Sequence, residues 1–338
     1  MKRLEAFSLG KKFDQPEANE DSFVVIPNVG YAVIDGVTDR NGTRYEGMLS
    51  GQYASLLVKR ATEVYFLAQS DPDAPTYMRY RGPKSFISYL TDCLYRGYKR
   101  AGVATTVKND WKLRAGCTLM AAFVHEGRLE VVAVGDSGIR INGTDTLQLL
   151  KPLDDVMGIL RREAWQYFAQ KGESPQRSDR LAAGITWPGT ANQLPDSETS
   201  DREVLGEIER RALAAVKTHL PGIAEAEIVE LLRNGIAYGQ GNFQNVDGRD
   251  LGYGGLDGFP VPERYIEHRS YDLAEVKQLE LFSDGYFKPG DGFGIEAWEK
   301  AFREVEEVDP HKIGAYLSTK GTTAKAVTDD RTYLGVVL

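Results

Sequence analysis

Short apolar runs arranged as hairpins constrain the fold of this chain more than any other feature of its sequence. The runs SFVVI at 22–26 and YAVI at 31–34 flank a Pro-Asn-Val-Gly turn, and runs at 117–125 and 128–134 flank Glu126-Gly127. Apolar, β-branched runs on both sides of turn residues are typical of antiparallel hairpins. Further strands are expected at 139–141, 264–269, 277–282 and 332–338.

Apolar residues at helical spacing predict several helices among these strands. The strands and helices do not alternate strictly, which favours an α+β fold with antiparallel sheets over a parallel one. The stretch from Leu150 to Pro262 is irregular, so we interpret it as an insertion within a single domain that spans residues 1–338. The helices are expected at 47–68, 84–100, 201–220, 225–234, 295–305 and 311–318.

The composition excludes several classes of protein. A net charge of −8 argues against a non-specific nucleic-acid binder, which needs a basic face. No apolar run is long enough for a signal peptide or a membrane span, and 42% hydrophobic residues suffice for a core. The two cysteines, Cys93 and Cys117, are too few for a disulfide framework. We therefore expect a cytoplasmic protein with reduced thiols.

Acidic residues stand at the predicted ends of many of these strands. Any one of them is most simply explained as a turn or cap residue. Two of them, Asp35 and Asp284, are followed directly by glycine, which allows close approach of the backbone to a ligand. Several carboxylates in one place repel each other unless cations neutralise them, and oxygen-only sets favour Mg²⁺ or Mn²⁺. The acidic residues in question are Glu20, Asp21, Asp35, Asp136, Asp284, Asp329 and Asp330.

The blocks that contain these residues resemble, in order, the motifs of the metal-dependent type 2C protein phosphatases, in a divergent bacterial form. The resemblance covers roughly residues 1–150 and 263–338, and no single block is specific. It implies a β-sandwich of two antiparallel sheets flanked by pairs of helices. The segment at about 150–262 is expected to be a flap-like insertion in this fold. The blocks are NEDSF (19–23), VIDGV (33–37), GCT (116–118), VGDSG (134–138), FSDGY (282–286) and TDDRTYLGVVL (328–338).

The resemblance also implies a metal centre with two ions of Mn²⁺ or Mg²⁺. Asp35 would bridge both ions. The side chain of Glu20 and the carbonyl oxygen of Gly36 would serve one ion. Asp284 and Asp329 would serve the other.

Three further residues take roles from the same resemblance. Asp21 would orient the attacking water, and Asp136 resembles the aspartate that helps to hold a third, weaker ion in many bacterial members. Asp330 would hydrogen-bond the site. The family cleaves phosphoserine and phosphothreonine in proteins by direct attack of a metal-activated water, without a phosphoenzyme.

The chain departs from the family pattern where the substrate phosphate is held. The usual phosphate-binding arginine is replaced by Pro16, and the loop after Gly36 is longer and has no histidine. Arg40 and Arg44 in that loop, or Lys12, are the predicted phosphate-binding residues, and Arg40 is favoured because its loop starts at the metal site. The alternative is that both arginines pair with neighbouring acids on the surface.

The complete acidic set favours an active hydrolase, a serine/threonine phosphoprotein phosphatase whose partner is a phosphorylated protein. The missing arginine favours an alternative, a catalytically weak or inactive phosphatase-like module with a binding or regulatory role. A further alternative is a two-metal phosphomonoesterase that acts on a small molecule. No nucleic-acid or membrane partner is expected.

Overall fold

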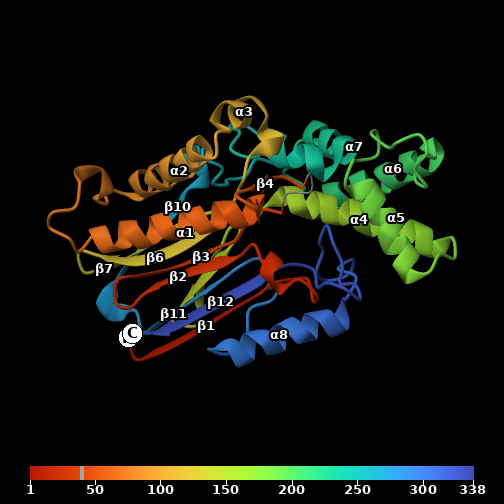
Figure 1. The fold of residues 1–338 in the computed structure, drawn as a ribbon. Helices are drawn as coiled ribbons and strands as arrows, with labels where there is room; N and C mark the ends of the chain where they lie inside the picture. Colours follow the sequence, from red (N-terminus) through yellow and green to blue (C-terminus); the bar gives the residue numbers. More distant parts are fainter. Residues whose placement is uncertain (39–41) are drawn as a thin grey trace. The chain divides into compact units, whose positions relative to one another are not determined.

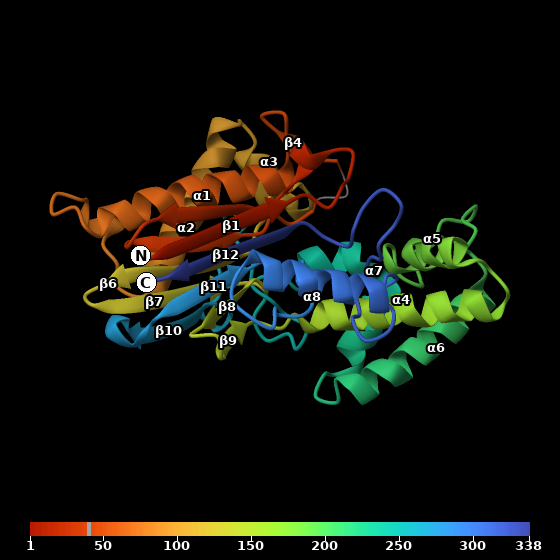
Figure 2. The same cartoon turned by 90° about the horizontal axis from the view of Figure 1, so that it is seen from below.

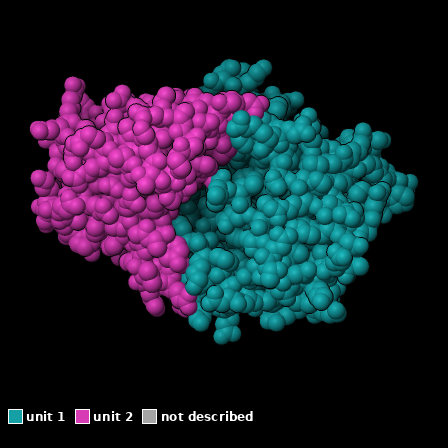
Figure 3. Space-filling view, turned by 180° about the vertical axis from the view of Figure 1, so that it is seen from behind, with its two compact units in different colours: residues 1–150, 254–302, 329–338 teal, residues 151–253, 303–328 magenta. Residues whose placement is uncertain are grey.

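The computed structural model describes residues 1–38 and 42–338, which divide into two compact units. Unit 1 comprises residues 1–150, 254–302 and 329–338, and unit 2 comprises 151–253 and 303–328; Figure 3 shows them in two colours. The predicted single domain of residues 1–338 remains a prediction.

Unit 1 contains two five-stranded antiparallel sheets, which confirms the predicted fold class. One sheet has the order β10-β7-β6-β3-β2, with β2 (Ser22–Ile26), β3 (Gly30–Ile34), β6 (Leu119–His125), β7 (Arg128–Val134) and β10 (Glu267–Asp272). The other has the order β1-β12-β11-β8-β9, with β1 (Arg3–Leu9), β8 (Gly138–Ile141), β9 (Asp145–Gln148), β11 (Gln278–Phe282) and β12 (Arg331–Val337). A small ribbon joins β4 (Arg44–Tyr45) to β5 (Met48–Leu49).

The two sheets pack face to face, as alternation along β3 makes clear. Successive side chains of a strand point to opposite faces of the sheet. Tyr31 and Val33 therefore lie in the core between the sheets, whereas Ala32 and Ile34 lie in the core under the helices of unit 1. Figure 1 shows these helices over the β2–β3–β6 face. They are α1 (Ser50–Ala68), α2 (Pro83–Arg100) and the short α3 (Ala104–Asn109).

The outer face of the second sheet is covered by the first part of α8 (Ile295–Val308), which runs beside β1 and β12 in Figures 1 and 2. The ring of Trp298 packs 4.5 Å from the ring of Phe282 and 5.2 Å from that of Tyr333, centroid to centroid. The Trp298 indole N–H donates to the Glu280 carboxylate at 2.8 Å, so the buried ring has a partner for its one polar atom.

Unit 2 is helical and has its own apolar core, which corrects the expectation of an irregular insertion with two helices. The expected helices are present near their predicted positions. The two helices that were missed, at 152–170 and 175–186, both start with proline. The first of them buries an apolar stripe that includes Leu153, Val156 and Leu160. The helices are α4 (Pro152–Gln170), α5 (Pro175–Thr186), α6 (Arg202–His219) and α7 (Glu225–Asn242).

The predicted helix at 311–318 is wrong, because the Asp309 side chain forms hydrogen bonds with the backbone of this segment. The Asp309 carboxylate accepts hydrogen bonds from the backbone N–H groups of Ile313, Gly314 and Tyr316 at 3.1, 2.8 and 3.1 Å. An aspartate that binds nearby backbone donors stabilises a turn in place of a helix. Strand β10 also starts later than predicted, since residues 263–265 form a 3-10 turn.

Within the described part of the chain, none of the helices combines the length and apolar character that a membrane span requires.

Candidate metal centre

The acidic residues predicted from the sequence gather at one end of the two sheets of unit 1. Antiparallel pairing places the start of one strand beside the end of its neighbour. Ser22 pairs with Ile34, so the residues before β2 lie beside those after β3. Tyr333 pairs with Phe282, so the residues before β12 lie beside those after β11. The residues at this end include Glu20, Asp21, Asp35, Asp284, Asp329 and Asp330.

Three carboxylates form the tightest group. Asp35, Asp136 and Asp284 each offer an oxygen, and these oxygens lie within 4.8 Å of one another. Asp35 and Asp136 follow strands of one sheet, and Asp284 follows a strand of the other. The face-to-face packing of the sheets therefore creates the group, and an all-oxygen set of this kind fits a hard divalent cation such as Mg²⁺ or Mn²⁺.

Burial and mutual repulsion of these carboxylates favour the binding of a cation. Burial, together with the charges of Asp21, Asp329 and Asp136, raises the pKa of Asp35 well above its ordinary value. Burial and the neighbouring carboxylates raise the pKa of Asp284 in the same way, and the two side chains share a hydrogen bond. Without metal, burial and like charges therefore favour the protonated form of these carboxyls; with metal, a cation can neutralise the carboxylates instead.

Asp21 lies beside this group, and only one of its two carboxylate oxygens accepts a hydrogen bond from a described residue. The hydroxyl of Thr332 donates to Asp21 Oδ2 at 2.8 Å. Asp21 Oδ1 is buried and has no hydrogen-bond partner among the described residues. Burial and the charge of Asp330 raise the pKa of Asp21 to about 7. A buried carboxylate oxygen without a donor fits a water or an ion at this position.

Lys11 is a residue of this site that the sequence did not suggest. Its ammonium lies 2.9 Å from Asp329 Oδ1, 3.2 Å from Asp330 Oδ2 and 3.5 Å from Glu20 Oε2. Burial alone would lower the pKa of Lys11, but the charges of these three carboxylates outweigh that effect and raise it. The residue follows β1, whose last residue, Leu9, pairs with Arg331 at the start of β12. No local sequence pattern points to Lys11, because its place depends on the pairing of β1 with β12.

Two glycines of the site are required by close backbone contacts. A Cβ at Gly36 would lie 2.6 Å from the carbonyl oxygens of both Glu20 and Gly51. A Cβ at Gly285 would lie 2.1 Å from the carbonyl oxygen of Asp330. Real Cβ atoms do not approach so closely, so each Asp-Gly pair brings an aspartate next to the neighbouring acidic strand end. The glycines thus serve the assembly of the acidic group.

The structure does not test the three predicted phosphate-binding residues. Arg40 lies outside the described residues. Arg44 is exposed and donates to the carbonyl oxygen of Gly47 at 2.9 Å, and Lys12 is exposed with its ammonium 3.4 Å from Gln15 Oε1. These three residues remain predictions for phosphate binding.

The cysteines behave as expected. Both are free thiols, and Cys117 is fully buried in the core under the helices. Burial and the charge of Asp35 raise the pKa of the Cys117 thiol well above its ordinary value. A thiol held neutral in a core is not a nucleophile.

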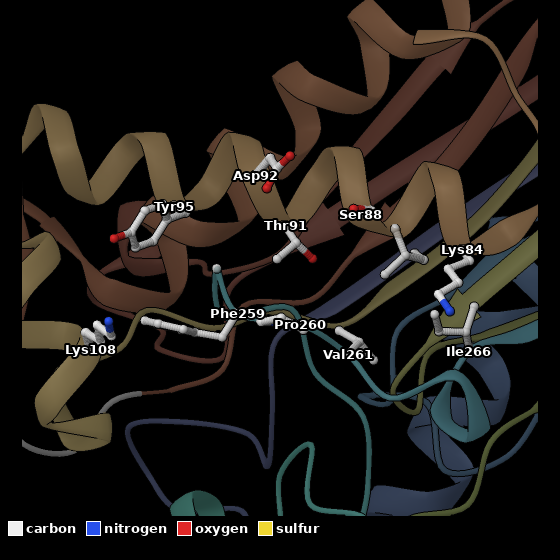
Figure 4. A pocket seen from close by; sticks show the side chains of 12 residues that line it. Lys84, Ser88, Thr91, Asp92, Tyr95, Lys108, Phe259, Pro260, Val261 and Ile266 are labelled. Carbon is white, nitrogen blue, oxygen red and sulfur yellow. The ribbon is translucent and has the colours of Figure 1, made fainter. Parts of the chain in front are cut away.

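A separate pocket of about 350 Å³ lies between α2 and the segment 258–266 (Figure 4). The Phe259 ring packs at its edge against Tyr95, 5.8 Å between centroids, and the Arg114 guanidinium lies 3.8 Å from the Phe259 ring centre. None of the acidic strand-end residues lines this pocket. It is therefore distinct from the candidate metal centre.

No family model matches the sequence, and a search of curated proteins found no match. Solved structures do resemble the fold over almost the whole chain. A bacterial serine phosphatase is 12% identical with a TM-score of 0.45, covering 99% of this chain and 97% of that one. The serine/threonine phosphatase Stp1 from Staphylococcus aureus is 13% identical with a TM-score of 0.44, covering 99% and 95%. The catalytic domain of the serine/threonine phosphatase PstP, in complex with two manganese ions, is 16% identical with a TM-score of 0.40, covering 98% and 96%.

Proposed function

We propose that this chain is a metal-dependent phosphatase that hydrolyses phosphoserine and phosphothreonine in proteins. The observation that carries the proposal is the group formed by Asp35, Asp136 and Asp284, whose oxygens lie within 4.8 Å of one another at the joined ends of two sheets. Such a group costs folding free energy through mutual repulsion and burial. A fold that retains it is best explained by a function that needs divalent cations.

The metal-ligand roles that we propose for these residues follow the family resemblance. Asp35 would bridge two ions, with Glu20 and the Gly36 carbonyl on one side and Asp284 and Asp329 on the other. Divalent ions in such a set supply Lewis-acid polarisation of the phosphoryl group and lower the pKa of a water nucleophile. The protein's own contribution is to hold these oxygens in place before substrate arrives.

Asp21 is suited to orient that water. The Thr332 hydroxyl occupies Oδ2, which leaves the buried Oδ1 to accept a hydrogen bond from the nucleophile. Asp330 acts on the backbone, since its two oxygens accept from the N–H groups of Lys11 and Glu20 at 2.7 and 3.2 Å. Asp136 would help to hold a third, weaker ion.

One observation favours the alternative of a weak or inactive phosphatase-like binding module. The Lys11 ammonium lies among carboxylates that would serve the ions, and a cation there opposes the entry of another. Hydrolytic activity separates the two functions.

The test is hydrolysis of a chromogenic phosphate ester by the metal-free protein, with and without added Mn²⁺, followed by a panel of phosphopeptides. We expect turnover only with the ion, loss of turnover on chelation, and cleavage of phosphoserine and phosphothreonine peptides. Turnover of the ester alone, with no peptide cleaved, would favour a small-molecule phosphomonoesterase. Absence of turnover at every Mn²⁺ concentration would favour the binding module.

A second prediction concerns the residue that holds the substrate phosphate in place of the missing arginine. A planar or ammonium donor near the ions fixes the orientation of a dianion. We expect Arg40→Ala, or failing that Arg44→Ala or Lys12→Ala, to lower kcat/KM for the ester ~10- to 100-fold, as for loss of a charge-assisted hydrogen bond. Affinity for Mn²⁺ should not change.

Arg60→Ala is the matched control, because Arg60 is an exposed arginine on α1 and should keep the parent rate. If all three variants also keep the parent rate, none of these side chains holds the phosphate and the hypothesis is wrong.

A further inference from the structure

The ammonium of Lys11 is enclosed by oxygens in a way that resembles the surroundings of a bound cation. Besides its ion pairs with Asp329, Asp330 and Glu20, it donates to the hydroxyl of Thr38 at 2.8 Å. Only 12% of the Lys11 side chain is exposed, and Glu20 and Asp330 are almost completely buried, at 2% and 3%. A surface lysine that happens to meet an acid does not have four oxygen neighbours from several chain segments.

The local structure fixes this position. Strand β1 pairs with β12 up to Leu9, and the N–H of Lys11 then donates to Asp330 Oδ1 at 2.7 Å. This hydrogen bond fixes the backbone of Lys11 at the acidic strand end, so its side chain starts close to these carboxylates. The Thr38 hydroxyl, which accepts from Lys11, donates in turn to Glu20 Oε2 at 2.7 Å.

The acidic site thus has two parts with different neighbours. Asp35, Asp136 and Asp284 form a close group whose oxygens lie within 4.8 Å of one another. Glu20 and Asp329, by contrast, each have the Lys11 ammonium as an ion-pair partner. An ion that enters the first part meets carboxylates, whereas an ion that needs Glu20 meets a fixed positive charge.

We infer that Lys11 is an internal cation that competes with one of the two divalent ions. The ion served by Glu20 and Gly36 binds only in exchange for the Lys11 ammonium, which must leave Glu20 and Asp329. The ion served by Asp35, Asp284 and Asp329 shares only Asp329 with Lys11, because Asp35 and Asp284 form no ion pair with that ammonium among the described residues, so this ion binds without complete displacement of the charge. The inference builds on the proposed two-ion site and assigns unequal affinities to its two ions, with Lys11 as the residue that sets the difference.

The experiment is calorimetric titration of the metal-free protein with Mn²⁺ alone, so that no catalytic rate enters the result. The variants are Lys11→Met, which keeps the length of the side chain and removes its charge, and Lys2→Met as the control. Lys2 is an exposed lysine of the same N-terminal segment. We expect a tight and a weak binding step in the parent and in Lys2→Met. In Lys11→Met the weak step should tighten by ~10- to 100-fold, the factor for a charge-assisted hydrogen bond that the ion no longer has to break.

Three results would contradict these expectations. A second step in Lys11→Met that matches Lys2→Met overturns the inference and leaves the two-ion phosphatase intact. Loss of a binding step in Lys11→Met also overturns it, because Lys11 would then organise the site. If neither the parent nor any variant binds Mn²⁺, the metal-dependent function itself fails.

Thermal unfolding gives a second measurement, which covers the case in which Lys11→Met is unfolded without metal. Between a low and a high Mn²⁺ concentration, ligand binding raises Tm by mass action. The rise should be larger in Lys11→Met than in Lys2→Met, because the variant lacks the competing charge. An equal rise in the two variants would overturn the inference.

Discussion

Asp35→Asn is expected to lower hydrolysis of a phosphate ester at saturating Mn²⁺ by ~10²–10³-fold, the range for loss of one electrostatic stabiliser of a transition state. The substitution removes the charge that would bridge two ions and keeps the shape of the side chain. Calorimetry should show that Mn²⁺ binding is weakened as well. The measurement is the rate with the ester, at a Mn²⁺ concentration that saturates the parent.

The fold of the variant should survive for a reason that the structure supplies. Burial and neighbouring carboxylates already raise the pKa of Asp35, so the neutral form is favoured when no ion is bound. The backbone contact of this residue is also preserved, since the N–H of Thr118 donates to the Asp35 carbonyl oxygen at 2.8 Å. The metal-free variant should therefore melt no lower than the metal-free parent.

Asp14→Asn is the matched control for this substitution. Asp14 is an exposed aspartate of the same unit, and its amide variant should keep both the parent rate and the parent affinity for Mn²⁺. Parent-like hydrolysis by Asp35→Asn would show that Asp35 is not a metal ligand and would remove the basis of the two-ion assignment.

Gly285→Ala is expected to have the second-largest effect, although it adds a single methyl group. The new Cβ would lie 2.1 Å from the carbonyl oxygen of Asp330, and backbone must move to admit it. Overpacking of this kind costs about 1–3 kcal/mol in unfolding free energy. A displacement of site residues by about 1 Å can lower a rate ~10²-fold. Thermal unfolding and ester hydrolysis measure the two effects.

Gly292→Ala serves as the control, because its nearest neighbour would be the Cβ of Ala297 at an ordinary 3.8 Å. It should unfold and hydrolyse like the parent. Should Gly285→Ala behave in the same way, the close approach of the Asp284 and Asp330 segments is not needed for the site.

The parts of the fold that follow from local pattern were predictable. The hairpins at 22–34 and 119–134 have apolar strands on both sides of turn residues, and both formed with the expected pairing. The acidic strand ends were likewise visible as Asp-Gly and Glu-Asp steps next to apolar runs. Antiparallel pairing then brings strand ends together without any further information.

The parts that depend on distant pairing were not predictable. The place of Lys11 depends on β1 lying beside β12, and its contact with Asp329 spans 318 positions. Strand β1 carries no strong apolar alternation, since most of its residues are exposed or half-buried. The helix predicted at 311–318 is wrong for a related reason. The Asp309 carboxylate accepts hydrogen bonds from that backbone, and local helix propensity does not include such a contact.

The pairing of β1 with β12 also has a consequence for the order of events in folding. The hydroxyls of Ser8 and Thr332 meet at 2.8 Å across 324 positions, so this edge of the sheet closes one of the longest loops in the chain. Contacts between such distant segments form slowly, after local hairpins and helices. Lys11 reaches the acidic group only when this pairing is made. Divalent ions at the proposed centre would bind the native state after the folding barrier, and we therefore expect them to prolong the lifetime of the folded protein without speeding its formation.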